Sequence, residues 1–388
     1  MSEEDATALR QVEGITSVTR DIIVRWIPDT HEITEDDVVQ LDDVQIEAHD
    51  PSDALFFDDF QWNMRQIDAD DAWATGAQAD PDVLVAILDT GINPTHIDLA
   101  GRVDIGLSRT FVTSSIVADD LSSFDDFNFH GTHVAGIVST NGLGTSGVAP
   151  HATLVAVKVL SATGSGSFAD VINGILYAAS IPVDVINMSL GADIPNTPGN
   201  APLLNALSEA IEEALDAGVF VVAAAGNSAR QLLEVEGEGE LLSVPAQSDE
   251  DVAAIAATGP VNQANFDRLA SYSNFGGDDV ISVGAPGGGV LGVAADFILS
   301  PCSASNIPGI PGGLPFKCGA GSFVFVAGTS QAAPHVAGLG ALIDSQFGGS
   351  LDGDDLKKII EKTSDNVGPK KTLGEGRINV FKALTGDD

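Results

Sequence analysis

Residues 202–227 read PLLNALSEAIEEALDAGVFVVAAAGN, an amphipathic helical pattern followed directly by a buried strand pattern. Apolar residues recur at three- and four-residue spacing as far as Gly218, and glycine commonly ends a helix. The next residues, VFVVAAA (219–225), form a continuous apolar run of strand length. Strands that are apolar on both faces are typical of a parallel sheet covered by helices. This segment therefore predicts an α/β fold.

The same alternation extends along most of the chain. Further apolar runs of strand length are VLVAIL (83–88), TLVAVKVL (153–160), VDVINMSL (183–190), VAAIAAT (252–258) and VISVGAP (280–286). A second helical pattern, FADVINGILYAAS, covers residues 168–180. We therefore expect a three-layer α/β/α fold with a mostly parallel central sheet. Such sheets bind ligands at the carboxyl ends of their strands.

The charge of the chain excludes some partners. Acidic residues outnumber basic ones 56 to 17, which gives a formal net charge of −39. Such a surface repels nucleic acid and anionic membranes, so we expect neither as a partner. We interpret it as a solvated acidic coat that maintains solubility or suits high salt. The apolar runs are too short for a membrane span, and the N-terminus MSEEDATALRQ lacks the pattern of a signal peptide.

Three short segments carry residues of catalytic type. They are AILDTGINPTHIDL (86–99), HGTHVAG (130–136) and AGTSQAAPHVAG (327–338). Asp89 ends a buried strand, where a carboxylate needs a partner. His130 and His133 open a helix of small residues. Ser330 lies in the first turn of another helix, whose free N–H groups favour negative charge.

These residue types form a known chemical set. A serine hydroxyl needs a base to remove its proton, and a neutral imidazole is the usual one. The imidazole in turn needs a carboxylate to fix its tautomer, and a tetrahedral intermediate needs donors for its oxyanion. Asn227, in AAAGNS (223–228), is a candidate donor together with the backbone N–H of Ser330.

Taken singly, each residue has a plainer interpretation. Asp89 could be a strand-end cap, Ser330 a helix cap and Asn227 a turn residue. His130 and His133 could be a metal pair, although no HExxH motif and no obvious third ligand follows. Only the ordered set is specific.

The motifs DTG, HGTHVAG, AAGN and GTSxAxPHVAG, in this order, resemble the subtilisin-like serine protease family, the subtilases. The resemblance extends from about Trp62 to about Leu384. It implies a catalytic triad and an oxyanion donor, with His133 as a structural neighbour and no cofactor required for the chemistry. The implied residues are Asp89, His130, Ser330 and, as oxyanion donor, Asn227.

The resemblance also implies two backbone edges that bind an extended substrate by strand addition. They are formed by Gly164, Ser165 and Gly166 and by Ser189, Leu190 and Gly191. In addition, VPA (244–246) matches a family position at which the proline is cis.

The sequence departs from the family pattern at three places. Gln331 follows the nucleophile, where many members have methionine. RQLLEVEGEGELL (230–242) replaces a short loop near the specificity pocket and adds four glutamates. The loop NGLGTS (141–146), which in the family helps to bind calcium, looks shortened. Asp98 still matches one calcium ligand, so a structural calcium ion remains an open expectation.

Cys302 and Cys318 lie 16 residues apart in a segment rich in glycine and proline. We expect a local disulfide, and two unpaired loop thiols are the alternative. A disulfide indicates an oxidising compartment and hence a secreted or cell-envelope protein. The missing signal peptide favours the intracellular alternative.

The N-terminal residues differ from the rest. Residues 13–27 read as a strand or strand pair with two arginines, Arg20 and Arg25, and residues 28–60 contain twelve acidic residues and no Lys or Arg. We interpret residues 1–50 as a propeptide remnant and solvated processing linker, and residues 51–388 as the peptidase domain. By resemblance, we expect self-cleavage between about residue 44 and residue 58.

These observations predict a monomeric serine endopeptidase of broad specificity that acts on protein or peptide substrates and is first bound by its own propeptide. Two alternatives are a processing peptidase with a narrow substrate set and an inactive subtilase-like binding protein.

Overall fold

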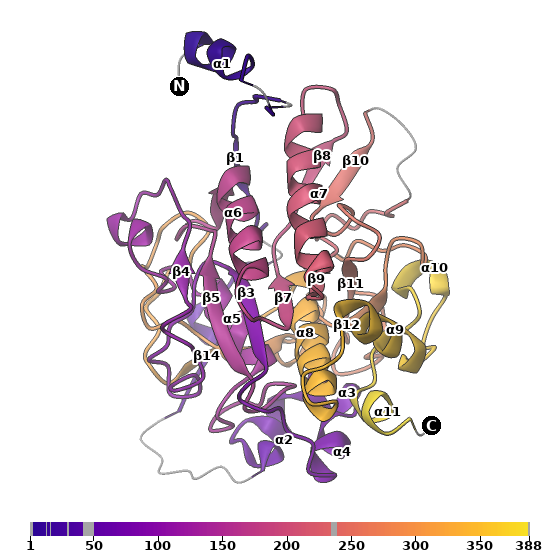
Figure 1. The fold of residues 1–388 in the computed structure, drawn as a ribbon. Coiled ribbons are helices and arrows are strands. Elements are labelled where there is room, and N and C mark those ends of the chain that lie inside the picture. The colour runs from indigo at the N-terminus through magenta and orange to yellow at the C-terminus, as the bar shows by residue number, and fades with distance from the viewer. Residues whose placement is uncertain are drawn as a thin grey trace.

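A computed structural model describes residues 3–12, 14–15, 17–28, 31–41, 50–233 and 239–386. Its centre is a sheet of seven strands in the order β12-β11-β9-β7-β3-β5-β4, all parallel (Figure 1). The strands are β3 (Leu84–Asp89), β4 (Arg109–Thr110), β5 (Thr153–Lys158), β7 (Val185–Met188), β9 (Phe220–Ala224), β11 (Ala253–Thr258) and β12 (Val283–Pro286). All six runs predicted as buried strands lie in this sheet, so the predicted parallel sheet is confirmed.

Helices cover both faces of the sheet. On one face lie α6 (Phe168–Ala179) and α7 (Ala201–Asp216), and on the other lie α5 (His130–Val138) and α8 (Thr329–Gln346) (Figure 1). Successive residues of a strand point to opposite faces. In β3, Val85 packs with α5 and α8, whereas Ala86 packs with α6 and α7. The predicted three-layer fold is therefore present.

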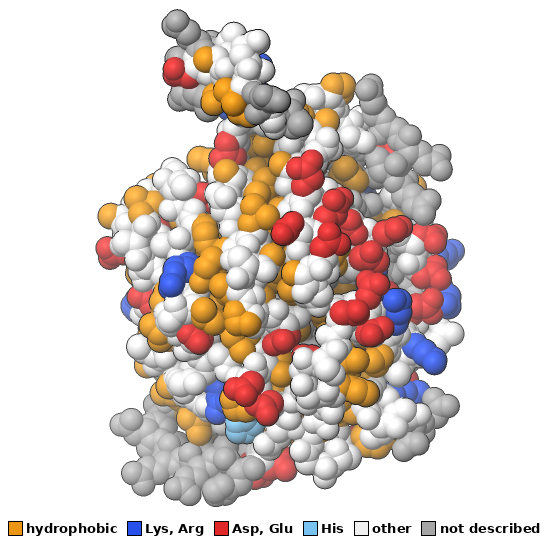
Figure 2. All heavy atoms as spheres, in the orientation of Figure 1, with side chains coloured by type: hydrophobic (Ala, Val, Ile, Leu, Met, Phe, Trp, Pro, Cys, Tyr) orange, Lys and Arg blue, Asp and Glu red, His pale blue; other side chains and the backbone are white. Residues whose placement is uncertain are grey.

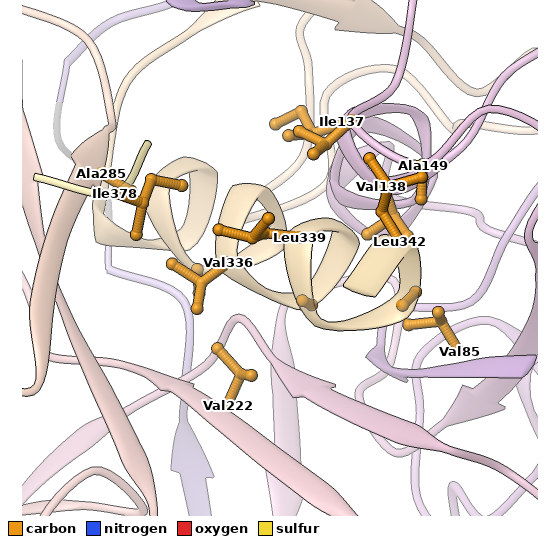
Figure 3. Packing of buried hydrophobic residues seen from close by; sticks show 14 of the residues in the cluster. Val85, Ile137, Val138, Ala149, Val222, Ala285, Val336, Leu339, Leu342 and Ile378 are labelled. Carbon is orange, nitrogen blue, oxygen red and sulfur yellow. The ribbon is translucent and has the colours of Figure 1, made fainter. Parts of the chain in front are cut away.

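Helix α8 is buried along most of its length, from Thr329 to Asp344. Figure 3 shows how its side chains Val336 and Leu339 lie above the sheet residue Val222, while Leu342 lies beside α5. Burial on all sides fixes the position of the first turn of α8. The sheet and α5 thus hold the residue that the sequence predicts as the nucleophile.

Smaller antiparallel sheets border the main one. They are β13 (Ile298–Pro301), β14 (Ser322–Val326) and β2 (Val38–Gln40); β8 (Ala192–Pro195) with β10 (Leu241–Val244); and β1 (Ile23–Arg25) with β6 (Ser165–Ser167). The other helices are α1 (Glu3–Leu9), α2 (Phe57–Phe60), α3 (Trp62–Gln66), α4 (Ala69–Ala74), α9 (Gly353–Thr363), α10 (Lys370–Leu373) and α11 (Val380–Thr385). Short 3-10 helices are Glu35–Asp37, Pro51–Asp53, Ala118–Leu121 and Ala294–Asp296.

The acidic segment before residue 50 is not only a solvated linker. β2 pairs with β14, the strand that leads into α8, in a register that aligns Gln40 with Ser322. The amide of Gln40 also donates to the Ser322 hydroxyl at 2.6 Å. Val38 and Val39 pack against two different apolar clusters, which explains why an acidic run contains a strand. Residues 42–49 lie outside the described residues, so the expected cleavage region is only partly visible.

The acidic residues gather on the outer surface, as expected for a solvated coat. Figure 2 shows acidic side chains along the face that α7 covers. The exposed acidic residues of α7 are Glu209, Glu212, Glu213 and Asp216. Within the described part of the chain, every helix is too short or too polar to cross a bilayer.

Candidate active site

Asp89 and His130 meet at the carboxyl end of the central sheet. Asp89 is the last residue of β3 and is fully buried, and His130 is the first residue of α5. Nδ1 of His130 lies 2.9 Å from Oδ1 and 3.0 Å from Oδ2 of Asp89. A carboxylate only accepts, so Nδ1 carries the proton and Nε2 is left as the acceptor. This is the tautomer that a general base requires.

A second buried carboxylate fixes the start of α5. Asp126 accepts hydrogen bonds from the Thr90 and Thr132 hydroxyls and from the backbone N–H groups of Asn128, Phe129 and Thr132, at 2.7 to 3.0 Å. Burial raises the pKa of Asp126, although its hydrogen bonds and Lys158 oppose the shift. These bonds tie the helix that carries His130 to the residue after Asp89. Asp126 was not among the residues predicted from the sequence.

Lys158 is a buried cation next to the same strand end. It ends β5, is the register partner of Asp89 and is fully buried. Its ammonium lies 2.9 Å from Oδ1 of Asp120 and donates to the carbonyl oxygens of Thr90 and Asp125. It therefore fixes the loop behind the Asp89–His130 pair. Lys158 was not predicted from the sequence, although a lysine inside the apolar run TLVAVKVL is a visible signal.

Ser330 is the second residue of α8 and is 5% exposed. It lines a cleft of about 510 Å³ together with His130 and Asn227. Its hydroxyl donates to the carbonyl oxygen of Ser189 at 3.0 Å, and the Ser189 hydroxyl donates to the carbonyl oxygen of Ser330 at 2.8 Å. The single proton of Ser330 Oγ is thus directed to Ser189 here, and catalytic hydrogen bonds often form only when substrate is bound.

Asn227 follows β9 and faces the same turn. Its Oδ1 accepts from the backbone N–H of Thr329 at 2.9 Å and from the Thr329 hydroxyl at 2.8 Å. Because these bonds engage the acceptor end of the amide, Nδ2 is left as the donor. Asn227 and Ser330 also line a second cleft of about 260 Å³.

The two predicted substrate edges lie on opposite sides of one extended segment, which is the chain's own residues 23–26. β1 pairs with β6 so that Val24 is opposite Gly166 and Arg25 is opposite Ser165. The backbone N–H of Trp26 donates to Gly164 O at 3.0 Å, and its carbonyl accepts from Gly191 N–H at 2.9 Å. The predicted edges therefore can bind main chain, and here they pair with the N-terminal segment.

The smaller cleft lies beside these edges. Leu190, Gly191, Asp193 and Ser243 are among its lining residues, and Arg25 and Trp26 border it. The Val244–Pro245 peptide bond is cis, as the family resemblance implied. Asp193 accepts from Arg230 at 2.6 Å and from the Ser228 hydroxyl at 2.9 Å, so its charge is paired. Of the four added glutamates, Glu234, Glu236 and Glu238 lie outside the described residues.

Cys302 and Cys318 form a disulfide, with their Cα atoms 6.1 Å apart, so the predicted pairing is confirmed.

His133 is fully buried in α5, and its Nε2 faces the carbonyl oxygens of Val324 and Ile298 at 3.1 and 3.2 Å. Burial lowers the pKa of His133 to about 3, with a further contribution from His130. His133 is therefore a neutral structural residue.

Asp98 is held by the loop of residues 141–146. Its Oδ1 accepts from the N–H of Leu143 at 2.7 Å, and its Oδ2 accepts from those of Gly144 and Thr145 at 2.9 Å. Burial raises the pKa of Asp98 to about 6 against the effect of these bonds. Calcium requires oxygen ligands, whereas this loop presents N–H donors to Asp98. The described residues contain no cluster of three or more His, Cys, Asp or Glu side chains suited to a metal ion.

Comparisons with known proteins agree with this geometry. A sequence profile described as the Subtilase family matches residues 80–377. The thermophilic serine proteinase of Bacillus sp. (strain AK1) is 33% identical over 342 residues, 87% of this chain and 70% of that protein. Subtilisin DY of Bacillus licheniformis is 35% identical over 319 residues, 82% of this chain and 96% of that protein.

Solved structures show the same architecture. The epidermin leader peptide processing serine protease of Staphylococcus aureus has a TM-score of 0.72 and 25% identity, covering 88% of this chain and 84% of that one. The nisin leader peptidase of Lactococcus lactis has a TM-score of 0.69 and 22% identity, covering 85% of this chain and 94% of that one. At this level of identity, the latter likeness concerns the fold alone.

Proposed function

Because this chain belongs to the subtilase family and is a serine peptidase that hydrolyses peptide bonds, we propose that it cleaves proteins internally with Ser330 as nucleophile. His130 acts as the base, Asp89 orients it, and Asn227 stabilises the oxyanion. The observation that supports this most is the contact of His130 Nδ1 with both Asp89 oxygens, on the wall of the cleft that contains Ser330.

The proposed reaction has two halves. Ser330 Oγ attacks the substrate carbonyl while its proton passes to Nε2 of His130, and Asp89 stabilises the resulting imidazolium. Nδ2 of Asn227 and the N–H of Ser330 receive the negative oxygen. The C–N bond then breaks, and the imidazolium protonates the leaving amine. A water molecule, deprotonated by His130, hydrolyses the acyl-enzyme and restores Ser330.

The substrate groove supports broad specificity. Residues 164–166 and 189–191 recognise main chain, and the hydrogen bonds of Trp26 exemplify this recognition. Backbone pairing tolerates many side chains. A narrow processing role is the second candidate, because solved structures with the same fold include leader peptide processing enzymes. Cleavage of unfolded casein at many sites supports the first candidate, and cleavage at one junction supports the second.

The N-terminal segment, as a propeptide, first occupies this groove and is removed when the enzyme matures. The position of residues 23–26 between the two edges supports this role. The disulfide supports a secreted or cell-envelope location, because such bonds persist in oxidising compartments.

The test of the proposed nucleophile is Ser330→Ala. It should abolish peptide hydrolysis and covalent labelling by a fluorophosphonate, while circular dichroism and the melting temperature stay close to those of the parent. Ser271→Ala, at an exposed serine, is the matched control and should keep both activities. Hydrolysis or labelling that survives in Ser330→Ala would contradict the proposal.

A further inference from the structure

The disulfide closes a loop directly upstream of the nucleophile. Cys302 follows β13, Cys318 precedes β14, and β14 leads into Ser330. The loop encloses its own apolar cluster, which we call the loop cluster and which is separate from the two main cores. Its buried members are Phe129, Cys302, Leu314, Phe316, Cys318, Val324 and Val326.

Polar contacts attach this loop to the catalytic elements. The Asn128 amide donates to Gly312 O at 2.9 Å and to Ala162 O at 2.7 Å. Asn128 lies two residues before His130, and Ala162 lies two residues before the substrate edge. Within the loop, Asn306 donates to Phe316 O at 2.7 Å and accepts from Cys318 N–H at 2.9 Å. The loop is therefore a fixed wall of the active site.

This wall faces the cleft that contains Ser330. Three members of the loop cluster, Phe129, Leu314 and Val326, line that cleft together with His130 and Ser330. The cluster thus presents an apolar surface beside the reacting groups, in addition to the two backbone edges.

The chain's own N-terminal segment shows which part of a peptide reaches this wall. Residues 24–26 line the smaller cleft, Pro28 lines both clefts, and residues 31–33 line the larger one. The segment therefore passes Ser330 from the backbone edges toward the loop. A substrate that pairs with β6 in the same antiparallel sense runs in the same direction. Its residues after the cleaved bond then face the loop.

One side chain of the segment marks the apolar subsite. Ile33 is partly buried and packs against the loop cluster. A branched aliphatic side chain on the leaving-group side of a bound peptide thus fits this surface, as Ile33 does. An acidic side chain there would lose its hydration against apolar groups.

We propose that Leu314 of the disulfide-closed loop 302–318 forms, together with Phe129 and Val326, an apolar subsite that recognises the leaving segment of the substrate. The ligand is a peptide with a branched aliphatic side chain after the cleaved bond. This inference rests on the proposed peptidase function.

The test uses two kinds of substrate. One is a series of internally quenched peptides that are identical before the cut and carry a single Ile at successive positions after it, in an otherwise Gly/Ser leaving segment. The other is a peptide p-nitroanilide with the same residues before the cut and no amino acid after it. The full chain is assayed once its rate on the p-nitroanilide is constant.

At one position after the cut, Ile should raise kcat/KM about tenfold over the Gly/Ser peptide, the scale of an apolar side chain in a pocket. Leu314→Asp should reduce this preference to less than about twofold, and its hydrolysis of the p-nitroanilide reports whether the catalytic groups are still in place. Pro308→Asp, an exposed position on the same loop, is the control and should keep the preference.

A preference for Ile that persists in Leu314→Asp would overturn the proposal, and so would the absence of any preference in the parent. If Leu314→Asp also loses p-nitroanilide hydrolysis, Leu314→Ala decides: lost preference with retained p-nitroanilide hydrolysis supports the subsite, and retained preference refutes it. A parent that cleaves neither substrate would instead refute the proposed peptidase function.

Discussion

The backbone N–H of Trp26 donates to the carbonyl oxygen of Gly164 at 3.0 Å, so the groove of this peptidase holds a strand of its own chain. The side chain adds to this attachment. Trp26 is fully buried, its indole N–H donates to Gly166 O at 3.0 Å, and its ring centroid lies 5.1 Å from that of Phe168. The segment is thus anchored at one large apolar residue.

We expect Trp26→Ala to loosen the N-terminal segment. Truncation of a buried tryptophan costs about 3–5 kcal/mol, which here opposes docking of the segment rather than folding of the sheet. Trypsin should cleave after Arg25 at least about tenfold faster in the double variant Trp26→Ala/Ser330→Ala than in Ser330→Ala alone. The rate is measured by mass spectrometry under native conditions.

Ile23→Ala is the matched control for this prediction. Ile23 lies on the same strand but is 65% exposed, so its truncation removes little packing. Equal rates of tryptic cleavage in the Trp26→Ala and Ile23→Ala proteins would show that Trp26 does not anchor the segment.

The sequence predicted the central sheet and the site for the same physical reason. Strands buried on both faces must be apolar throughout. Runs such as residues 219–225 can therefore be recognised as strands from their own sequence, without knowing which strands they pair with. Asp89 and Asn227 each follow such a run, and parallel strands bring their carboxyl ends to one edge. The position of Asp89 and Asn227 at one edge was therefore predictable, whereas the pairing of Asp89 with His130 was implied by the family resemblance.

Other features depend on contacts between distant segments. β2 lies in an acidic run, and only its pairing with β14 makes it a strand. Likewise, Lys158 is stable inside the protein because Asp120 and two carbonyl groups meet it there. The N–H groups around Asp98 depend on the conformation of the 143–145 backbone, which side-chain patterns do not encode.

Asn227→Ala should lower kcat about 100- to 1,000-fold with little change in KM, the scale known for one lost oxyanion donor in subtilisin itself. Thr329→Val is a milder variant that tests how the Asn227 amide is oriented. Its hydroxyl donates to Asn227 Oδ1 at 2.8 Å, so its removal leaves only the backbone N–H of Thr329 to hold the amide and should cost less than the loss of the amide. Steady-state kinetics on a p-nitroanilide measures both. An unchanged kcat in Asn227→Ala would exclude it as the oxyanion donor.

Asp98→Asn should destabilise the fold by about 1–3 kcal/mol at pH 8, because an amide has one acceptor oxygen and turns a donor toward backbone N–H groups. Asp104→Asn is the control, since this carboxylate accepts from Leu107 N–H and lies nearer the surface. In a Ser330→Ala background, urea unfolding should show the same decrease in the free energy of unfolding on Asp98→Asn in EDTA and in calcium. If calcium stabilises the parent but not Asp98→Asn, Asp98 is a calcium ligand and the shortened loop binds metal.

The last prediction concerns His96, a buried neutral imidazole. Its Nε2 faces Ser322 O at 2.9 Å and its Nδ1 faces the backbone N–H of Asp98 at 3.2 Å, so one tautomer satisfies both nitrogens. Burial lowers the pKa of His96 to about 4 from an ordinary value of 6.5. Between these values the unfolded chain binds a proton that the folded chain does not. The contribution of His96 to the free energy of unfolding is therefore fully present above pH 6.5 and decreases as the pH falls toward 4.

His96→Gln removes the titration and keeps a side-chain amide. In a Ser330→Ala background, the parent should lose about 2 kcal/mol more free energy of unfolding than His96→Gln when the pH is lowered from 7 to 5, since each pH unit in the window contributes about 1.4 kcal/mol. The carboxylate of Asp98, whose raised pKa acts in the opposite direction, is present in both proteins and largely cancels. Leu99→Ala, a buried apolar change nearby, should cost the same free energy at both pH values. If the parent and His96→Gln have equal pH dependence in urea unfolding, His96 is already protonated in the folded protein at pH 5.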